Sequence, residues 1–388
     1  MQIGVVIEHF DPRRGGAEQW TWQLVQRLLA RGHEVHVVSQ DFAAETASLG
    51  IVAHALGRVH GRLRLARAAE SALQRLRVDV IHDMALGWYC DLLHSHDGSR
   101  RAQWEHKLLM LPPWMRPWKR ALIGALPRYR EFRRLMDRQF APPQRLVLAL
   151  SQMVAQDYER YHRVAAERIR LVYNGVDVER FSPAWRPQHR APTRGRLGVA
   201  DGEALFLFVG HDFLRKGLAS ALRAVGRLRS AGHPVRLAVV GGKRPQRHER
   251  LAARLGVASA VTFLGAVDDP VPYYAAADAF VLPTFYDPCS LGVLEAAASG
   301  LPSITTRYNG AGELMTDGVE GYVLADPADD QALAGRMQEL LEPALRDRMG
   351  QAARQLALGH TLERNCDQIE EIYREIVERR RASISTVR

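Results

Sequence analysis

The chain has 388 residues, of which 47% are hydrophobic and 25% charged, a composition that excludes disordered and membrane-spanning classes and predicts about two globular domains. No stretch approaches the ~18 apolar residues of a spanning helix. Three isolated cysteines exclude a disulfide framework, and the short apolar run 3–7, followed at once by acidic residues, is not a signal peptide, so we expect a cytoplasmic protein despite the net charge of +10.

The first half of the chain alternates strands with helices. A strand over 3–7 leads through Gly15 and Gly16 into a helix over 17–30, and further strands are expected at 35–39, 80–82, 146–150 and 169–173. This alternation predicts a parallel sheet with helices on both faces, which binds ligands at the carboxyl ends of its strands. The glycine pair permits close approach of an anion, although a lone pair of glycines more often marks a plain tight turn.

Residues 100–138 carry eleven basic and three acidic side chains, a local excess that nearly accounts for the net charge. Aromatic residues interleave with these cations, namely Trp104, Trp114, Trp118, Tyr129 and Phe132. An interfacial membrane patch has this composition, because tryptophan prefers the headgroup boundary and clustered basic residues attract anionic lipid. A nucleic-acid surface and a partly buried insert remain as alternatives.

Three prolines among polar residues over 182–196 predict a linker. We therefore expect a first domain over 1–181 and a second over 197–361, with a C-terminal helix over 362–388 that packs back on the first. Strands and helices alternate in the second domain as well, so both domains are expected to be Rossmann-like and to face a cleft.

Two segments of the second domain are candidates for an anion site. In the first, a strand over 205–209 precedes Arg215 and Lys216, whose cations suit a diphosphate, unless they are merely solvated. In the second, a strand over 279–282 ends shortly before Asp287, and the following helix, over 290–299, contains Glu295. The start of this helix would offer backbone N–H groups to a phosphate, while the two carboxylates could accept sugar hydroxyls. The first residues of the helix are Ser290, Leu291 and Gly292.

Together these segments resemble family GT4 of the retaining GT-B glycosyltransferases, and within it the lipopolysaccharide glucosyltransferase I group. The resemblance covers most of the chain, and each motif is weak alone. The motifs are Gly15 to Glu18, Asn174 to Asp177, Val209 to Gly217, Ala275 to Asp278 and Tyr286 to Pro302.

The resemblance implies a role for each matching residue. Arg215 and Lys216 would neutralise the donor diphosphate, Gly16 would let it approach the first domain, Glu295 would hold the ribose, and Asp287 would contact the donor sugar. Family members usually have Glu at the position of Asp287 and Gly at that of Ser290. The shorter acid at 287 would change which donor sugar fits. They often have a His or Asp near the reacting sugar, for which His94, His96 and Asp97 are candidates, with Asp97 preferred.

The expected activity is metal-independent, retaining transfer of a hexose, with glucose as the preferred sugar and UDP as the preferred carrier. The expected acceptor is a lipid-linked saccharide such as the lipopolysaccharide core, presented at the inner face of the cell membrane, where the chain would bind anionic lipid through 100–138. No cofactor and no nucleic acid are expected. The alternatives are a sugar-nucleotide epimerase of the same architecture and a nucleic-acid-binding protein that uses 100–138, although the second leaves Lys216, Asp287 and Glu295 unexplained.

Overall fold

The computed structural model describes residues 1–242 and 245–385, and it divides into two compact units. Unit 1 contains residues 1–172 and the C-terminal helix from residue 362, and unit 2 contains residues 173–361. The division falls between Val172 and Tyr173, before the segment that was expected to be a linker. The last three residues of the expected 362–388 helix lie outside the described residues.

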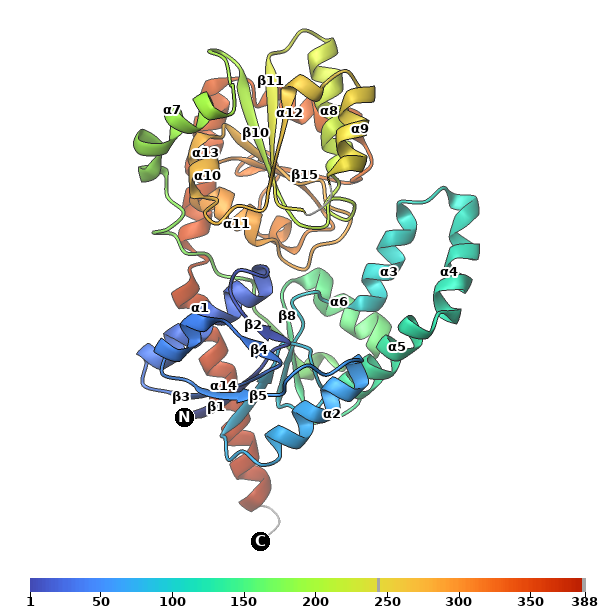
Figure 1. Cartoon of the computed structure of the whole chain (residues 1–388), viewed down its shortest axis with the longest axis vertical. Coiled ribbons are helices and arrows are strands. Elements are labelled where there is room, and N and C mark those ends of the chain that lie inside the picture. Colours follow the sequence, from blue (N-terminus) through green and yellow to red (C-terminus); the bar gives the residue numbers. More distant parts are fainter. Residues whose placement is uncertain (243–244, 386–388) are drawn as a thin grey trace. The chain divides into compact units, whose positions relative to one another are not determined.

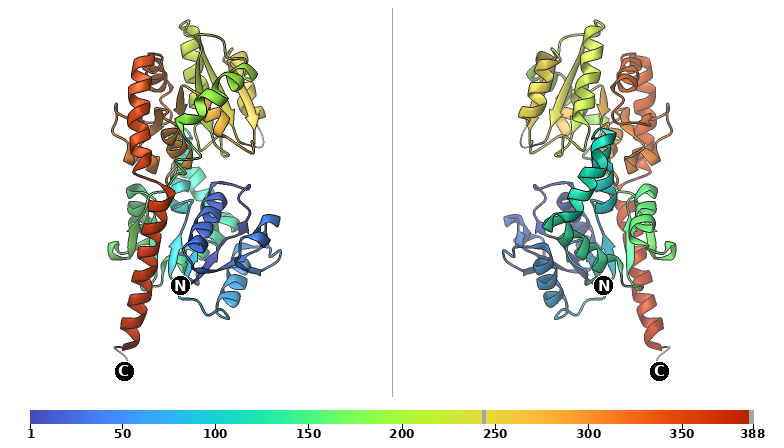
Figure 2. Two further views of the ribbon diagram at one scale, coloured as in Figure 1. Left: turned by 90° about the vertical axis from the view of Figure 1, so that its left-hand side faces the viewer. Right: turned by 90° about the vertical axis from the view of Figure 1, so that its right-hand side faces the viewer.

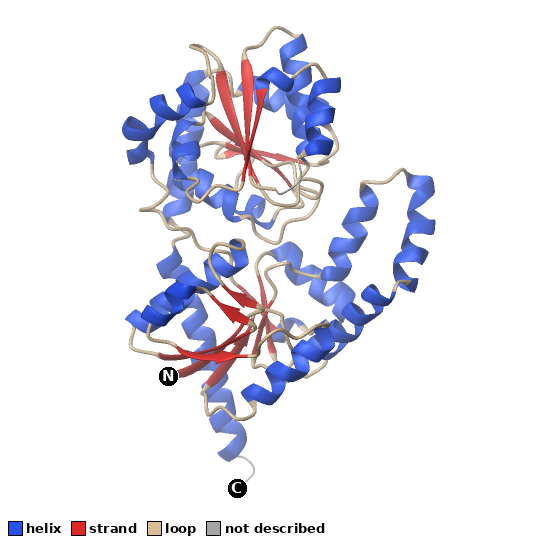
Figure 3. Ribbon diagram, viewed as in Figure 1, coloured by secondary structure: helices blue, strands red, loops and turns tan. Residues whose placement is uncertain are grey.

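The described part of unit 1 contains a parallel sheet of seven strands between two helical layers (Figures 1 and 3). The apolar side chains of its central strands are buried. In sheet order the strands are β5 (Val52–Ala55), β3 (Glu34–Ser39), β1 (Gln2–Val6), β6 (Val80–Asp83), β7 (Leu92–His94), β8 (Leu146–Ala149) and β9 (Ile169–Leu171). A separate parallel pair joins β2 (His9–Phe10) to β4 (Asp41–Phe42). The sheet order reverses direction between the neighbouring strands β1 and β6, as in doubly wound folds, so the loops after these two strands are natural ligand positions.

The helices of unit 1 include a group that projects from the sheet, formed by the basic segment and coloured teal and green in Figure 1. This helical projection consists of α3 (Arg100–Leu109), the short η2 (Pro113–Met115), α4 (Arg116–Ala125) and α5 (Pro127–Phe140). The other helices are α1 (Gly16–Ala30), η1 (Ala44–Ser48), α2 (Arg62–Leu73), α6 (Gln152–His162), η3 (Ala166–Arg168) and α14 (Leu362–Ser385).

Helix α14 packs along the rest of unit 1, although nearly 190 residues separate it from Val172 in the sequence (Figure 2). Arg31, at the end of α1, forms ion pairs with Glu363 at 2.9 Å and with Asp367 at 2.7 Å. On another turn of α14, the hydroxyl of Tyr373 lies 2.7 Å from Nδ1 of the buried His82 on β6. Polar contacts at its surface and in the core therefore fix the helix on this unit.

The described part of unit 2 contains a parallel sheet of six strands covered by helices on both faces (Figure 3). In sheet order the strands are β12 (Val261–Gly265), β11 (Val235–Val240), β10 (Ala204–Val209), β13 (Ala279–Val281), β14 (Ser303–Thr306) and β15 (Gly321–Leu324). The helices are η4 (Pro183–Trp185), α7 (Arg186–Arg196), α8 (Leu218–Ser230), α9 (Gln246–Arg254), η5 (Ala258–Ala260), α10 (Val271–Ala276), α11 (Leu291–Ala298), η6 (Gly310–Leu314), α12 (Asp330–Glu339) and α13 (Pro343–Leu358). The order again reverses at β10 and β13, whose following loops carry Lys216 and Asp287.

Residues 182–196, expected to be a linker, instead form η4 and α7. Two prolines stand in the first turns of these helices, where a missing N–H costs nothing. Helix α7 packs against α10, and its Arg190 and Arg194 both bond to the buried carboxylate of Asp278. Tertiary ion pairs thus stabilise a helix that has no apolar periodicity to predict it.

Candidate functional site

The loops after β10 and β13 are joined through backbone contacts in unit 2. The strands are parallel neighbours, so their carboxyl ends meet at one edge of the sheet. Gly217 has a φ of +77°, and a Cβ there would lie 1.9 Å from the carbonyl oxygen of Pro283. The amide of Phe285 also donates to the carbonyl of Arg215 at 2.8 Å. Only a glycine permits this approach, which fixes the two loops side by side.

A buried ion pair joins the two loops at their centre. The ammonium of Lys216 donates to the Asp287 carboxylate, and these side chains are only 14% and 8% exposed. Burial lowers the pKa of Lys216, while the Asp287 charge acts in the opposite direction. The pair places one cation and one carboxylate, both partly desolvated, at the same point of the sheet edge, where either can bind a polar ligand.

Arg215 is fixed beside this pair. Its guanidinium donates to the carbonyl of Tyr286 at 2.9 Å and lies 3.5 Å from the carboxylate of Asp212. The side chain is 16% exposed, so the cation is held in place but still reaches the surface. Two adjacent cations held in fixed positions can receive an anion at a low ordering cost.

Helix α11 starts at Leu291, four residues after Asp287, and Asn309 holds its start in place. The side-chain oxygen of Asn309, in the loop after β14, accepts from the amides of Ser290 and Ala311, both at 3.1 Å. The first-turn amides of Leu291 and Gly292 have no acceptor within an α-helix. They therefore add donors and the positive end of the helix dipole close to Lys216 and Asp287.

Glu295 lies one turn further along α11, where it accepts a hydrogen bond from the hydroxyl of Tyr274 on α10 at 2.7 Å. Burial raises the pKa of Glu295, whereas the Tyr274 bond and the nearby charges of Arg180 and Lys216 lower it. Tyr274 thus orients a half-buried carboxylate that retains acceptor capacity for hydroxyl groups.

The structure thus brings together, within unit 2, six of the residues that sequence reasoning selected: Arg215, Lys216, Asp287, Ser290, Leu291 and Gly292, with Glu295 one turn away. Sequence reasoning missed three residues that position them, Asn309, Tyr274 and Asn174. The Asn174 amide donates to the carbonyl of Cys289 at 2.7 Å, and among the described residues its buried Oδ1 has no partner. Asn174 belongs to one of the family motifs, so the sequence could have indicated its importance. No motif of the sequence analysis includes Asn309 or Tyr274.

The five residues selected in the first domain all lie in unit 1, namely Gly15, Gly16, His94, His96 and Asp97. Gly15 precedes α1, Gly16 is its first residue, and Trp20 of the same helix packs edge-on against His96, with 4.8 Å between ring centroids. Asp97 is half exposed and forms an ion pair with Arg100. Its carboxylate is therefore held by a neighbour three residues away.

A buried row of imidazoles extends from His96 into the core of unit 1. His94 packs against His96 with the rings tilted and their centroids 4.1 Å apart, and Nδ1 of His94 lies 3.2 Å from Nε2 of His82, which contacts Tyr373. Burial lowers the pKa of His96 to about 4 and that of His82 to about 3, so both rings are neutral at pH 7. Within the described residues, Nε2 of His94, Nε2 of His96 and Nε1 of Trp20 are buried without partners.

Two family models match the chain, one on each side of its middle. The model described as Glycosyltransferase Family 4 matches residues 14–180, and that described as Glycosyl transferases group 1 matches residues 190–356. Between them they leave only short segments unmatched.

Several characterised proteins are similar to the chain. Lipopolysaccharide glucosyltransferase WaaG of Escherichia coli is 31% identical over 202 residues, a match that spans 52% of this chain and 53% of that protein. A D-inositol 3-phosphate glycosyltransferase of Corynebacterium jeikeium is 29% identical, over 74% of this chain and 72% of its own.

Solved structures show the same fold. A crystal structure of WaaG has a TM-score of 0.80 at 23% identity and covers 96% of this chain and 99% of its own. Anabaena HepE in complex with UDP-glucose has a TM-score of 0.75 at 19% identity, over 97% of this chain and 100% of its own.

Proposed function

The chain belongs to the glycosyltransferases of group 1 and family 4, and we propose that it transfers a hexose, with glucose preferred, from a nucleoside-diphosphate sugar, with UDP preferred, to a lipid-linked saccharide. It is a glycosyltransferase of the GT-B fold. The retaining stereochemistry, the independence of metal, the sugar and the acceptor are the proposed parts.

The observation that carries the proposal is the fixed cluster of Arg215, Lys216 and Asp287 at the carboxyl edge of the unit 2 sheet. Cleavage of a sugar from a diphosphate develops negative charge on the leaving phosphate. Two ordered cations and the start of α11 supply positive potential for that charge, and no metal ion is needed for this role. The UDP-glucose complex of HepE, which shares the fold, supports the choice of donor.

The carboxylates of the cluster have separate proposed roles. Asp287 can exchange its bond to Lys216 for a hydroxyl of the donor sugar, leaving Lys216 to the diphosphate. Glu295, oriented by Tyr274, can accept the hydroxyls of the ribose. In unit 1, we propose Asp97 and His96 as contacts of the reacting sugar. We propose Gly15 and Gly16 as the place where the backbone permits close approach of the diphosphate.

The helical projection favours a lipid-linked acceptor. Trp114, Trp118 and Leu122 stand four residues apart in η2 and α4, and they are 73%, 80% and 52% exposed. We call these three residues the tryptophan face. Such rings beside basic residues suit the headgroup region of an anionic membrane, where a lipid-linked saccharide is presented. In the described residues, no helix combines the length and apolar character needed to cross a bilayer.

A second candidate acceptor is a soluble phosphorylated polyol, since a relative that matches a larger share of this chain than WaaG does, 74% against 52%, is named for D-inositol 3-phosphate. The tryptophan face argues against it, because a soluble acceptor gives no reason to expose two indoles. Transfer assays with both acceptor classes would separate the candidates.

The donor site is tested by calorimetric binding of UDP-glucose, GDP-glucose and ADP-glucose in EDTA. We expect one of them to bind wild type, and Lys216→Ala to weaken it by about 10- to 100-fold, because a charge-assisted bond to phosphate is lost and Asp287 is left unpaired. Arg223→Ala, at an exposed position on α8, is the matched control and should bind normally.

Thermal unfolding of both variants separates a lost site from a lost fold. If wild type binds none of the three nucleotides, the donor assignment is wrong. Metal-dependent binding alone would overturn the metal-independent part.

A further inference from the structure

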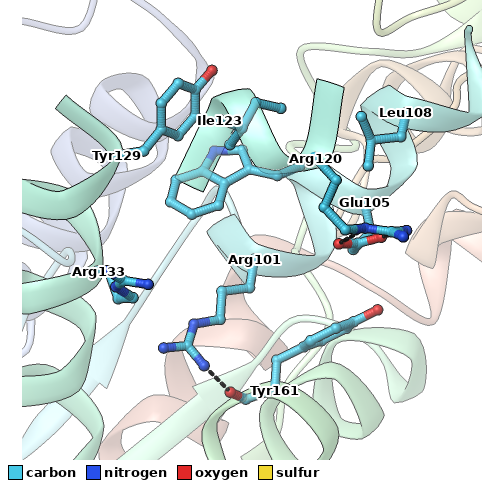
Figure 4. A pocket seen from close by; sticks show the side chains of 9 residues that line it. Arg101, Glu105, Leu108, Arg120, Ile123, Tyr129, Arg133 and Tyr161 are labelled. Carbon is cyan, nitrogen blue, oxygen red and sulfur yellow. Dashed lines mark hydrogen bonds and ion pairs between the residues drawn. The ribbon is translucent and has the colours of Figure 1, made fainter. Parts of the chain in front are cut away.

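A cavity of about 290 Å³ lies within the helical projection of unit 1, apart from the residues assigned above (Figure 4). Its lining comes from four helices: α3, α4 and α5 of the projection, and α6. The lining residues are Arg101, Trp104, Glu105, Leu108, Arg120, Ile123, Tyr129, Arg133 and Tyr161.

We propose that this cavity binds a single sugar ring that carries an oxyanion, a phosphate or a carboxylate, as one unit of the acceptor saccharide. The assignment to the acceptor rests on the proposed transferase function. The chemistry of the ligand rests on the cavity alone.

The volume limits the ligand to about one ring. Pockets that bury whole drug-sized ligands span roughly 300–1,000 Å³, so this cavity lies at the lower limit of that range. A sugar with one charged substituent is of that size. A nucleoside-diphosphate sugar is too large to be enclosed here.

The charges of the lining favour an anion. Arg120 forms a bidentate pair with Glu105, and Arg101 donates to Asp137 at 3.1 Å and to the carbonyl of Tyr161 at 3.0 Å. Figure 4 shows the guanidinium group of Arg120 turned toward Glu105 and that of Arg101 turned toward Tyr161. Arg133, from α5, is exposed and has no hydrogen-bond or ion-pair partner among the described residues, so its guanidinium group is available to an oxyanion.

The aromatic walls favour a ring. Trp104 and Tyr129 pack edge to face, with 4.8 Å between centroids, and Trp104 also packs against the core of unit 1. These fixed, amphipathic faces can cover the apolar face of a sugar. An acyl chain fits less well, because it would remove water from the guanidinium group of Arg133, which has no partner among the described residues, without replacing the lost hydrogen bonds. Glu105 can instead accept sugar hydroxyls.

The experiment is a ligand-observed NMR titration of the full chain with glucose 6-phosphate, glucuronate, glucose and glycerol 3-phosphate. We expect glucose 6-phosphate, glucuronate or both to bind at least about tenfold more tightly than glucose or glycerol 3-phosphate. The two charged sugars separate a phosphate from a carboxylate. Glycerol 3-phosphate represents a lipid headgroup, which has an oxyanion without a ring.

Arg133→Gln should weaken the bound charged sugar by about tenfold, whereas Arg134→Gln, an exposed neighbour on the same helix that does not line the cavity, should leave it unchanged. Equal affinity of wild type and Arg133→Gln would overturn the proposal. So would equal binding of glucose or glycerol 3-phosphate, or no binding of either charged sugar to wild type.

This titration needs neither donor nor transfer. Sugar-nucleotide binding, measured on the same samples, should be the same for Arg133→Gln and wild type. If wild type bound no sugar nucleotide, the proposed function would be refuted, while the result for the cavity would still stand. Comparable melting temperatures of the two Arg variants exclude a folding defect.

Discussion

Gly217 connects the fold of unit 2 to its candidate site, since its left-handed conformation brings Arg215 and Lys216 against the loop that carries Asp287. No side chain fits between this residue and the carbonyl of Pro283. The position of both cations therefore depends on the absence of one Cβ atom.

Gly217→Ala should destabilise the protein by about 2–4 kcal/mol, because the new methyl group overlaps backbone rather than a movable side chain and the residue must also keep a positive φ. Urea unfolding measures the change. Gly335→Ala is the matched control: this exposed glycine of α12 has no atom within 4 Å of an added Cβ, so alanine should stabilise that helix slightly. Equal effects of both changes would contradict this account.

At the scale of elements, the tryptophan face is the feature of the helical projection with a functional consequence. A turn of η2 and two turns of α4 place its three side chains in solvent, while Arg116 and Lys119 supply cations on the same segment. We expect these groups to act together at an anionic surface, since apolar insertion and charge attraction both contribute.

Replacement of both Trp114 and Trp118 by Ser should weaken binding to vesicles containing phosphatidylglycerol by at least about tenfold, because two interfacial indoles are lost. Sedimentation with sucrose-loaded vesicles measures this binding. Trp185→Ser is the control, as this tryptophan is 39% exposed but lies in unit 2. Binding of the double variant at wild-type strength would show that the tryptophan face does not contact lipid.

Elements with strong apolar patterns could be predicted from the sequence, and polar ones could not. The helix expected over 17–30 matches α1, whose Trp, Leu and Val side chains are buried at helical spacing. Helix α7 was missed because its stability comes from ion pairs with Asp278, nearly ninety residues away, and not from its own pattern. The strands β2 and β4 have two residues each, too few for a period.

The candidate site was predictable where topology alone fixes position. Arg215 and Asp287 follow adjacent parallel strands, so their proximity follows from the sheet order. The clamp by Asn309 and the bond from Tyr274 to Glu295 depend on how loops and helices pack, which no local spacing encodes. The cavity in the helical projection likewise requires four helices to converge.

At the scale of the whole molecule, the buried histidines make stability depend on pH. Burial lowers the pKa of His96 to about 4 and of His82 to about 3, and lowers that of His94 well below its usual range, whereas in the unfolded chain each titrates near 6.5. At a pH between the folded and the unfolded pKa of these histidines, the unfolded chain binds more protons than the folded chain. The free energy of unfolding should therefore fall as pH drops below about 6.5, by about 1 kcal/mol per pH unit for each histidine.

Asp83 opposes this trend. Burial raises its pKa to about 6, so as the pH falls the folded chain protonates Asp83 before the unfolded chain does. Its stabilising effect offsets the destabilising effect of about one histidine, so the free energy of unfolding should still fall. Urea unfolding at pH 7.5, 6.5 and 5.5 should show it, with a shallower slope for His96→Asn and an unchanged slope for His60→Asn, an exposed site. A free energy of unfolding that stays constant from pH 7.5 to 5.5 would mean that the imidazole row admits protons, and hence solvent, without unfolding.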